Sequence, residues 1–371
     1  MLTPNSEAEL AALVTKQNAP LRIGGGGTRD IGRPVEGTRL STRGLSGVTL
    51  YEPGALTLVA QAGTPVAEID TLLKAEGQRL PFEPMDHRAL LGTKGEPTIG
   101  GVIAANVSGP RRVAVGAARD FLLGVRFVDG TGQIVKNGGR VMKNVTGYDL
   151  VKLMAGSYGT LGILTEVSMK VLPAADAVAT LAFEGVDAPT AVDVMSSALG
   201  SPFDVTGAAY RAQTQTAYIR IEGFEQSVGY RTEALSKHLA TYGALTLHHG
   251  KAHDDLWRGI RDVADLSAAG PDIWRVSVKP SDALAVLVAT GAQDFQLDWG
   301  GGLIWIACEP GTDLRAQLAG ISGHATLIRA STDTRQRIAP FHPEPAPIAA
   351  ISKGLREKFD PKGILNPGIM L

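Results

Sequence analysis

The sequence has a single cysteine, Cys308, among its 371 residues. One thiol can form neither an internal disulfide nor a cysteine-rich metal or iron–sulfur site, so we expect a reducing, cytoplasmic environment. The chain also lacks an uninterrupted apolar run of about 18 residues, the length that a membrane-spanning helix needs. Its N-terminus, "MLTPNSEAELAALVTK", has neither the basic nor the apolar region of a signal peptide. We therefore expect a protein that is neither secreted nor membrane-spanning.

An excess of charge of either sign is absent too. Lysine and arginine number 36 and aspartate and glutamate 37, which gives a formal net charge of −1 at pH 7. This balance gives no electrostatic reason to expect a nucleic-acid partner. Neither G-x-G-x-x-G nor G-x-x-x-x-G-K-[ST] occurs in the sequence. The dinucleotide-binding Rossmann fold and the P-loop fold therefore lose support.

Glycine, by contrast, is abundant, and "LRIGGGGTRD" (Leu21–Asp30) places four glycines in a row after a short apolar run. Glycine gives up much conformational freedom on folding, so such a run indicates that something approaches the backbone closely. Consecutive backbone N–H groups can bind an anion such as a phosphate, with Thr28 and Arg29 as further donors. A flexible turn between two strands is the alternative.

Two further segments are rich in glycine and other small residues: "GEPTIGGVIAANVSGP" (Gly95–Pro110) and "AGSYGTLGILTEVSMKVLP" (Ala155–Pro173). Small side chains allow a large flat ligand to lie against the backbone. For Thr98–Asn106 a tightly packed contact between a helix and a sheet is the alternative.

The first part of the chain, to about residue 170, mixes short strands with glycine-rich turns and predicts an α+β domain. We expect strands at Leu21–Ile23, Leu56–Ala62, Val125–Val128 and Ile163–Val171, a helix over Val66–Glu76 and a hairpin over Phe127–Val135.

From about Ala177 the elements are longer and follow the order β-α-β-β-α-β twice, including a predicted helix over Asp313–Leu318. This order predicts two ferredoxin-like units packed as one antiparallel sheet. "RIAPFHPEPAPIAA" is expected to be a proline-rich connector, and "ISKGLREKFDPKGILNPG" a short helix followed by turns. The predicted domains are 1–173, a cap-like domain over 174–330, and a connector with a C-terminal segment over 331–371 that returns to the first.

These segments together resemble the FAD-binding domain shared by vanillyl-alcohol oxidase, p-cresol methylhydroxylase and D-2-hydroxyacid dehydrogenases. "IGGGGT" is similar to the pyrophosphate loop of that family and "TIGGVIAANVSG" to its segment along the flavin; "GYDLVKLMAGSYGTLGILTEV" and "FDPKGILNPG" follow in the family's order. Within the family, "GPRRVAVGAARDFLLGVRFVDGTG" and "VMKNVTGYD" most resemble the smaller, FAD-binding subunit of bacterial glycolate oxidase. The resemblance implies a two-part FAD-binding domain over 1–173 and 331–371, and a cap domain.

The resemblance also implies which residues contact FAD. They are Gly24, Gly25, Gly26, Gly27 and Thr28 in the pyrophosphate loop; Thr98, Gly100, Gly101, Ala105, Asn106 and Gly109 along the isoalloxazine and diphosphate; Asp120, a buried acid that helps to hold that segment; and the backbone of Ile163 at the adenine end. Asp120 can instead cap a strand or pair with Arg119. Gly26→Val is expected to weaken FAD binding much more than it destabilises the fold.

Some members of the family attach FAD covalently through a histidine in or near the glycine loop, or through a cysteine. No histidine lies in Leu21–Asp30, and Cys308 lies in the cap domain, so we expect non-covalent FAD. No catalytic residue is assigned. Arg111 and Arg112 can hold the carboxylate of a 2-hydroxy acid through a bidentate contact, with a solvated loop or a subunit contact as the alternative.

The similar D-2-hydroxyacid dehydrogenases carry a histidine pair and a Gly-Asp-Gly-Asn-Leu-His-like stretch in the cap domain, which bind a metal and the substrate. This sequence has no counterpart. His248, His249 and His253 cluster in "LHHGKAHDDLW", and the spacing of the last two allows a metal on one helix face. We expect instead a strand end that runs into a polar loop, and no metal.

The favoured hypothesis is an FAD-binding subunit of a glycolate oxidase complex. A larger homologous flavin subunit would carry the substrate site, and an iron–sulfur subunit would accept the electrons. One alternative is a stand-alone FAD-dependent 2-hydroxy acid dehydrogenase, and another is a non-catalytic nucleotide-binding scaffold. The expected location is the cytoplasm, where the complex can bring the chain to the inner face of the cell membrane. The sequence does not identify which 2-hydroxy acid is used.

Overall fold

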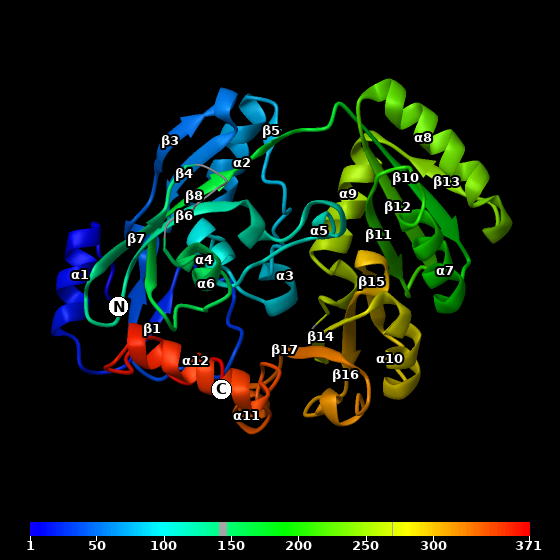
Figure 1. The fold of residues 1–371 in the computed structure, drawn as a ribbon. Coiled ribbons are helices and arrows are strands. Elements are labelled where there is room, and N and C mark those ends of the chain that lie inside the picture. The colour runs from blue at the N-terminus through cyan, green and yellow to red at the C-terminus, as the bar shows by residue number, and fades with distance from the viewer. Residues whose placement is uncertain (141–146, 269) are drawn as a thin grey trace.

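The computed structural model describes residues 1–140, 147–268 and 270–371, and its strands form two main sheets that lie side by side (Figure 1). We call the five-stranded sheet with its covering elements the first lobe. The eight-stranded sheet with its helices is the second lobe. The domain boundaries near residues 173 and 330 stay predictions. Within the described residues, no helix has the length and apolar character needed to cross a bilayer.

The first lobe is built on an antiparallel sheet in the order β3-β4-β8-β6-β7. Its strands are β3 (Val48–Glu52), β4 (Thr57–Gln61), β8 (Ile163–Lys170), β6 (Leu122–Val128) and β7 (Ile134–Gly138), and β1 (Leu21–Gly24) pairs in parallel with β2 (Thr38–Ser41) beside them. The helices are α1 (Glu7–Lys16), α2 (Val66–Ala75), α3 (Arg88–Leu91), α4 (Ile99–Ala104), α5 (Arg112–Val115) and α6 (Leu150–Met154). The predicted strands, the helix over Val66–Glu76 and the β6–β7 hairpin are confirmed.

Strand β8 brings the second glycine-rich segment back into the middle of this sheet. It pairs with β4 on one side and β6 on the other. The turn before it, Gly156–Gly162, therefore lies near the end of β1, although more than a hundred residues separate the two in sequence. Gly159 shows this approach, because a Cβ on it would stand 3.8 Å from Ile23.

The second lobe is one antiparallel sheet in the order β13-β10-β12-β11-β15-β16-β14-β17. Its first half contains β10 (Ala177–Glu184), α7 (Ala188–Leu199), β11 (Val205–Arg211), β12 (Thr216–Gly223), α8 (Glu225–His238) and β13 (Thr246–His248); its second half contains β14 (Asp272–Val278), α10 (Ala283–Thr290), β15 (Phe295–Asp298), β16 (Leu303–Cys308) and β17 (Gly323–Arg329). Each half has the ferredoxin-like strand order, and β11 pairs with β15 where the halves meet. The predicted sheet of two ferredoxin-like units is confirmed.

Two local expectations for this lobe are wrong. The helix expected over Asp313–Leu318 is only a 3₁₀ turn, Leu314–Ala316. The segment expected as a polar loop after His248 is helix α9 (Gly250–Arg261). Its buried residues His253, Trp257 and Ile260 follow the spacing of one helical face, and burial of that face stabilises the helix.

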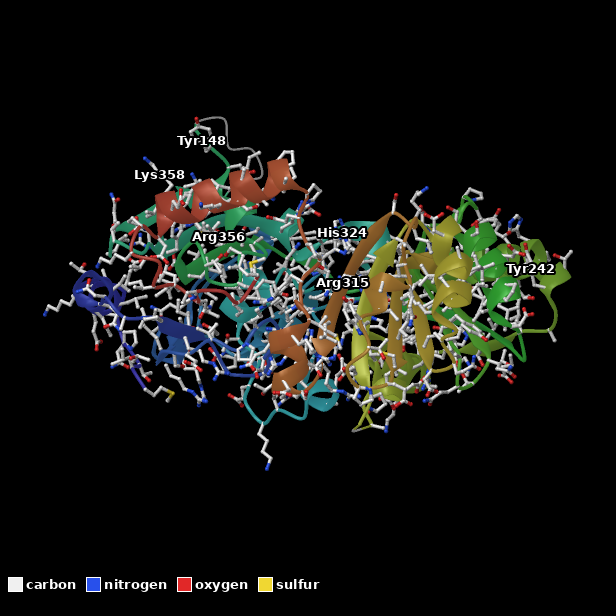
Figure 2. All side chains as sticks on the ribbon, turned by 90° about the horizontal axis from the view of Figure 1, so that it is seen from below. Tyr148, Tyr242, Arg315, His324, Arg356 and Lys358 are labelled. Atoms are coloured by element: carbon white, nitrogen blue, oxygen red, sulfur yellow. The ribbon has the colours of Figure 1, made fainter. Side chains whose placement is uncertain are left out.

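The C-terminal segment crosses from the second lobe back to the first through α11 (Thr332–Arg337) and α12 (Ala346–Phe359). Arg315 donates to the carbonyls of Phe341 at 2.8 Å and Ala339 at 2.6 Å, which fixes the connector to the second lobe (Figure 2). Helix α12 begins at Ala346, inside the segment expected as the proline-rich connector, so the connector is shorter than expected. Prolines at the start of the segment do not prevent this, because a proline in the first helical turn costs no helical hydrogen bond. After α12, the N–H of Leu21 donates to the carbonyl of Ile364 at 2.7 Å.

Candidate functional site

A cavity that is partly open to solvent lies where the glycine loop after β1, the start of α4, the turn before β8 and the C-terminal segment meet. The residues that line it are Ile23, Gly24, Gly25, Gly26, Gly27, Thr28, Arg29, Thr42, Ala62, Thr98, Gly100, Gly101, Ala104, Ala105, Tyr158, Gly159, Gly162, Ile163, Leu164, Asn366 and Ile369. None of these described lining residues is acidic, so the cavity suits an anion.

The four glycines of the loop serve two different purposes. A Cβ on Gly25 would lie 2.2 Å from the Thr98 hydroxyl, and one on Gly26 would lie 1.5 Å from the Glu96 carbonyl oxygen. These two residues therefore let the loop pack against the segment before α4. A Cβ on Gly24 or Gly27 would meet no atom within 4 Å, and Gly27 has a φ of +73°. Gly24 and Gly27 thus face open space, and the side chain of Gly26→Val would damage the fold as well as the site.

Backbone donors of this loop are available to a ligand. The N–H groups of Gly26, Gly27 and Thr28 make no hydrogen bond to any residue that the structure describes. Thr28 is buried and Gly26 half-buried, whereas Gly27 is exposed to solvent. Neighbouring N–H groups of a turn form concavities that bind anions. The loop therefore has the donor set that a diphosphate requires.

Arg29 adds a buried cation to the same cavity. Its Nε donates to Nδ1 of His87 at 3.2 Å, while its Nη2 is buried and has no partner within the described part of the chain. Burial lowers the pKa of Arg29 to about 10, so the guanidinium stays charged at neutral pH. Burial, and then the charge of Arg29, lower the pKa of His87 to about 3. The neutral imidazole can accept the Arg29 hydrogen bond, whereas the remaining guanidinium nitrogens are free for an anion.

The start of α4 supplies the wall opposite the loop. Thr98 caps this helix, and its hydroxyl accepts from the N–H of Gly101 at 3.4 Å. A Cβ on Gly100 would lie 2.6 Å from the Cβ of Ala62, so this glycine is needed for helix–sheet packing. The alternative drawn from the sequence, a tight helix–sheet contact, therefore holds at Gly100, while Ala104 and Ala105 leave room for a flat ligand.

Asn366 is a site residue that the sequence argument missed. Its Oδ1 accepts from the N–H of Ile23 at 2.7 Å and its Nδ2 donates to the carbonyl of Tyr158 at 2.8 Å. The side chain thus fastens the C-terminal segment to β1 and to the turn before β8. The only signal in the sequence was the residue type, since asparagine tolerates the left-handed backbone region. In the structure Asn366 adopts it, with a φ of +43°.

The structure brings most of the predicted FAD residues together. Those that line the cavity are Gly24, Gly25, Gly26, Gly27, Thr28, Thr98, Gly100, Gly101, Ala105 and Ile163. Asn106 and Gly109 are absent from that lining. The Oδ1 of Asn106 accepts from the N–H of Arg119 at 3.0 Å, and a Cβ on Gly109 would lie 2.2 Å from the Glu83 carbonyl oxygen. Contact of each residue with FAD stays a prediction.

The expectation that Asp120 is a buried acid is wrong. Its side chain is 47% exposed. One carboxylate oxygen accepts from the N–H of Ala117 at 2.8 Å, and the other lies 3.7 Å from Nε of Arg119. Asp120 therefore caps the short turn Ala118–Phe121 and lies beside Arg119, the partner that the alternative named. The turn buries Ala118 and Phe121 and leaves Arg119 and Asp120 in solvent.

Arg111 is not free to hold a substrate, so that expectation is corrected. Its side chain is 14% exposed and pairs with Glu222 of the second lobe at 2.5 Å and with Glu83 at 3.1 Å. Arg79 also pairs with Glu222 at 2.8 Å, and Arg220 with Glu83 at 3.0 Å. Two carboxylates already occupy the guanidinium of Arg111, and this buried ionic network joins the lobes. Arg112 instead lies over the indole ring of Trp299, 4.7 Å from its centroid.

The histidines of "LHHGKAHDDLW" are engaged in packing. Nδ1 of His253 lies 2.8 Å from the hydroxyl of Thr180, which also accepts from Nε1 of Trp257 at 2.8 Å. His249 Nδ1 lies 3.1 Å from the carbonyl of Val178. In residues 1–140, 147–268 and 270–371, no group of three or more histidine, cysteine or acidic side chains is arranged to hold a metal. Of the motif "VMKNVTGYD", residues 141–146 lie outside the described residues.

Comparison with known proteins agrees with the geometry. A family model described as FAD binding domain matches residues 1–138. Glycolate oxidase subunit GlcE of Escherichia coli (strain K12) is 36% identical over 355 residues, which cover 95% of this chain and 92% of that protein. Glycolate oxidase subunit GlcD of Bacillus subtilis (strain 168) is 30% identical over 196 residues, 51% of this chain but only 40% of that protein. The solved structure of an alkyldihydroxyacetonephosphate synthase has the same fold, with a TM-score of 0.71 and 19% identity over 98% of this chain and 76% of that one.

Proposed function

The chain belongs to the family of glycolate oxidase subunit GlcE, and from that membership we propose that it is the FAD-binding subunit of a complex that oxidises glycolate to glyoxylate. The family's members and the FAD-binding domain make it an FAD-dependent oxidoreductase that acts on 2-hydroxy acids. The identity of the acid and the make-up of the complex belong to the proposal.

The observation that carries the proposal is the donor set at the glycine loop. Free N–H groups at Gly26, Gly27 and Thr28 and the partnerless Nη2 of Arg29 surround a cavity without acidic lining residues in the described chain. A diphosphate supplies the negative charge and the acceptor oxygens that these groups lack. The residues present therefore fit FAD, bound without a covalent bond.

Each part of the cavity has a role in holding the cofactor. The loop and Arg29 would bind the diphosphate, and the small residues Gly101, Ala104 and Ala105 would lie along a flat ring system. When bound, FAD supplies the hydride acceptor for oxidation of the hydroxyl-bearing carbon. The chain itself orients the cofactor and excludes water from it.

The partners are inferred from what the chain lacks. A single cysteine cannot hold an iron–sulfur cluster, so a relay of that kind needs another polypeptide. The similar GlcD protein is named as a subunit of glycolate oxidase, which supports a larger flavin subunit beside this chain. We propose that electrons leave through the flavins to an iron–sulfur subunit.

The test is the visible spectrum of the purified chain, alone and with candidate partner subunits. We expect flavin bands that acid releases into the supernatant and that glycolate bleaches only in the reconstituted complex. Bleaching of the isolated chain by glycolate, with saturation, would favour the stand-alone dehydrogenase. Flavin that no substrate reduces, even in the complex, would favour the scaffold.

A further inference from the structure

Arg275, in the middle of β14, makes no direct ion pair within the described residues, although the charge of buried Asp298 on β15 acts on it. It lies between Trp305 of β16 and Thr326 of β17 in the sheet register. Its side chain makes no ion pair or hydrogen bond with any residue that the structure describes. Burial, and then the charge of Arg112, lower its pKa to about 10, while Tyr158 and Asp298 oppose this, so the guanidinium stays charged at neutral pH. The side chain is only half-buried, so an anion can still reach it.

Trp299 holds Arg275 at the boundary between the lobes. The guanidinium carbon of Arg275 lies 5.2 Å from the centroid of the indole ring, and that of Arg112 lies 4.7 Å from the same centroid. The indole Nε1 donates to the carbonyl of Gly109 at 3.1 Å, which ties this tryptophan of the second lobe to the first. One ring thus positions a cation from each lobe.

Tyr158 connects this pair of cations to the cofactor cavity. It lines that cavity, and its ring packs edge-on against Phe341 at 4.7 Å. The charges of Arg275 and Arg29 both lower the pKa of the Tyr158 hydroxyl, although burial leaves it raised overall. The hydroxyl therefore lies in the field of both arginines, and it makes no hydrogen bond within the described part of the chain.

The arginines near the cavity can be assigned to two different anionic ligands. Arg29, at the end of the glycine loop, is assigned to the diphosphate. Arg112 and Arg275 remain, and neither forms an ion pair within the described residues. An arginine fork matches a carboxylate in bidentate geometry, and a tyrosine hydroxyl can donate to the same group. A second, small anion therefore fits beside the cofactor.

We propose that Arg275 binds the carboxylate of a small 2-hydroxy or 2-oxo acid in this chain itself, with Tyr158 as a second donor and Arg112 as added positive potential. This inference rests on the proposed function, because it places the acid beside the flavin. It differs from the expectation for Arg111, whose guanidinium is occupied by Glu83 and Glu222.

The test is a calorimetric titration of the purified, FAD-loaded chain with glyoxylate, repeated while flavin absorbance is followed. Ethylene glycol, which has no carboxylate, is the ligand control. The variants are Arg275→Gln, Arg275→Lys and Arg112→Gln. Arg258→Gln is the matched control, since Arg258 is exposed on α9 and pairs with Asp255 at 3.1 Å.

We expect Arg275→Gln to weaken glyoxylate binding at least about tenfold, the loss of one charge-assisted bidentate contact. Arg275→Lys keeps the charge but loses the fork, so it should also bind more weakly. Arg112→Gln should cause a smaller loss, and Arg258→Gln none. Without ligand, Arg275→Gln should melt close to the wild-type temperature, because Arg275 is half-buried and makes no direct ion pair within the described residues. A residue with a merely structural role would lower it.

Unchanged glyoxylate affinity in both Arg275 variants, or no glyoxylate binding by the wild-type chain, would overturn the inference. Loss of FAD from Arg275→Gln with glyoxylate affinity intact would do the same, since it would assign Arg275 to the cofactor. A purified wild-type chain without flavin would instead refute the proposed function. Calorimetry on that flavin-free chain would still report whether Arg275 binds a carboxylate.

Discussion

At the scale of single residues, the glycine loop divides into positions that pack against other segments and positions that face open space. Gly25 and Gly26 touch Thr98 and Glu96, so a side chain there displaces the loop itself. Gly24 has open space around its missing Cβ and an ordinary φ. Only a substitution at a position of the second kind, such as Gly24, can weaken cofactor binding without also destabilising the fold.

Gly24→Val is therefore the sharper probe of FAD binding. We expect FAD affinity to fall about 10- to 100-fold, the equivalent of about 1–3 kcal/mol, because the side chain enters the space beside the free N–H groups. The melting temperature of the flavin-free chain should stay unchanged. Gly54→Val is the control, since Gly54 also has no atom within 4 Å of its missing Cβ and lies outside the cavity. Flavin content after dialysis measures the effect, and equal retention by both variants would contradict the loop assignment.

His87 gives a prediction about pH. Its pKa is about 3 in the folded chain, against an ordinary value of 6.5, because burial and Arg29 disfavour the charged ring. Between these values the unfolded chain binds one more proton than the folded chain. The stability contributed by neutral His87 is thus complete above about pH 6.5 and is lost as the pH falls, at roughly 1.4 kcal/mol per pH unit.

Urea unfolding between pH 4.5 and 7.5 tests this dependence. His87→Gln keeps an acceptor for Arg29 but does not titrate, so the free energy of unfolding should fall less steeply with decreasing pH than in the wild type. His249→Gln, at an exposed position far along the chain, is the control and should retain the wild-type slope. Equal slopes for His87→Gln and wild type would show that His87 is already free to protonate.

At the scale of elements, a buried ionic network joins β12 of the second lobe to segments of the first. Glu222 on β12 pairs with Arg79 and Arg111, and Arg220 on the same strand pairs with Glu83. These arginines hold the pKa of Glu222 far below its usual range, even though burial opposes this. Glu222 is therefore ionised at neutral pH, and its ion pairs join β12 to the first lobe.

Glu222→Gln should destabilise the chain by about 3–5 kcal/mol, because it leaves two buried arginines without their shared carboxylate. Denaturant unfolding measures the loss. Glu233→Gln removes an exposed carboxylate that pairs with Lys237 one helical turn away, and it should change stability by no more than experimental error. A Glu222→Gln variant as stable as the wild type would mean that solvent compensates the arginines.

At the scale of the whole molecule, we expect ligand binding by the isolated chain but substrate turnover only by the assembled complex. The isolated chain should bind FAD and a small carboxylate, yet reduce little or no dye with glycolate. A carboxylate anchor does not supply a base for the hydroxyl proton, and the histidine pair of the similar dehydrogenases has no counterpart in this sequence. Activity should appear when a larger flavin subunit and an iron–sulfur subunit are added. Dye reduction with and without those subunits measures it, and robust turnover by the chain alone would contradict the proposed division of labour.

The sequence by itself determined the features that depend on near neighbours in the chain. The strand before the glycine loop, the hairpin over Phe127–Val135 and the repeated β-α-β-β-α-β order follow from local hydrophobic period and turn residues. The family resemblance, read from the glycine-rich motifs, likewise pointed to ten residues that line the cavity, and their contact with FAD stays a prediction. Helix α9 could also have been predicted from the sequence, since His253, Trp257 and Ile260 have helical spacing.

Only the tertiary structure decided which members of similar pairs face the site. Arg111 and Arg112 are neighbours in sequence, but Glu222 neutralises the first, while the second meets Trp299. Gly24 and Gly26 differ only in what lies across from them, and Arg275 carried no motif at all. In each case the deciding group comes from another segment of the chain. Its distance and charge depend on how segments of one lobe, or of both lobes, pack together, and no local pattern encodes that.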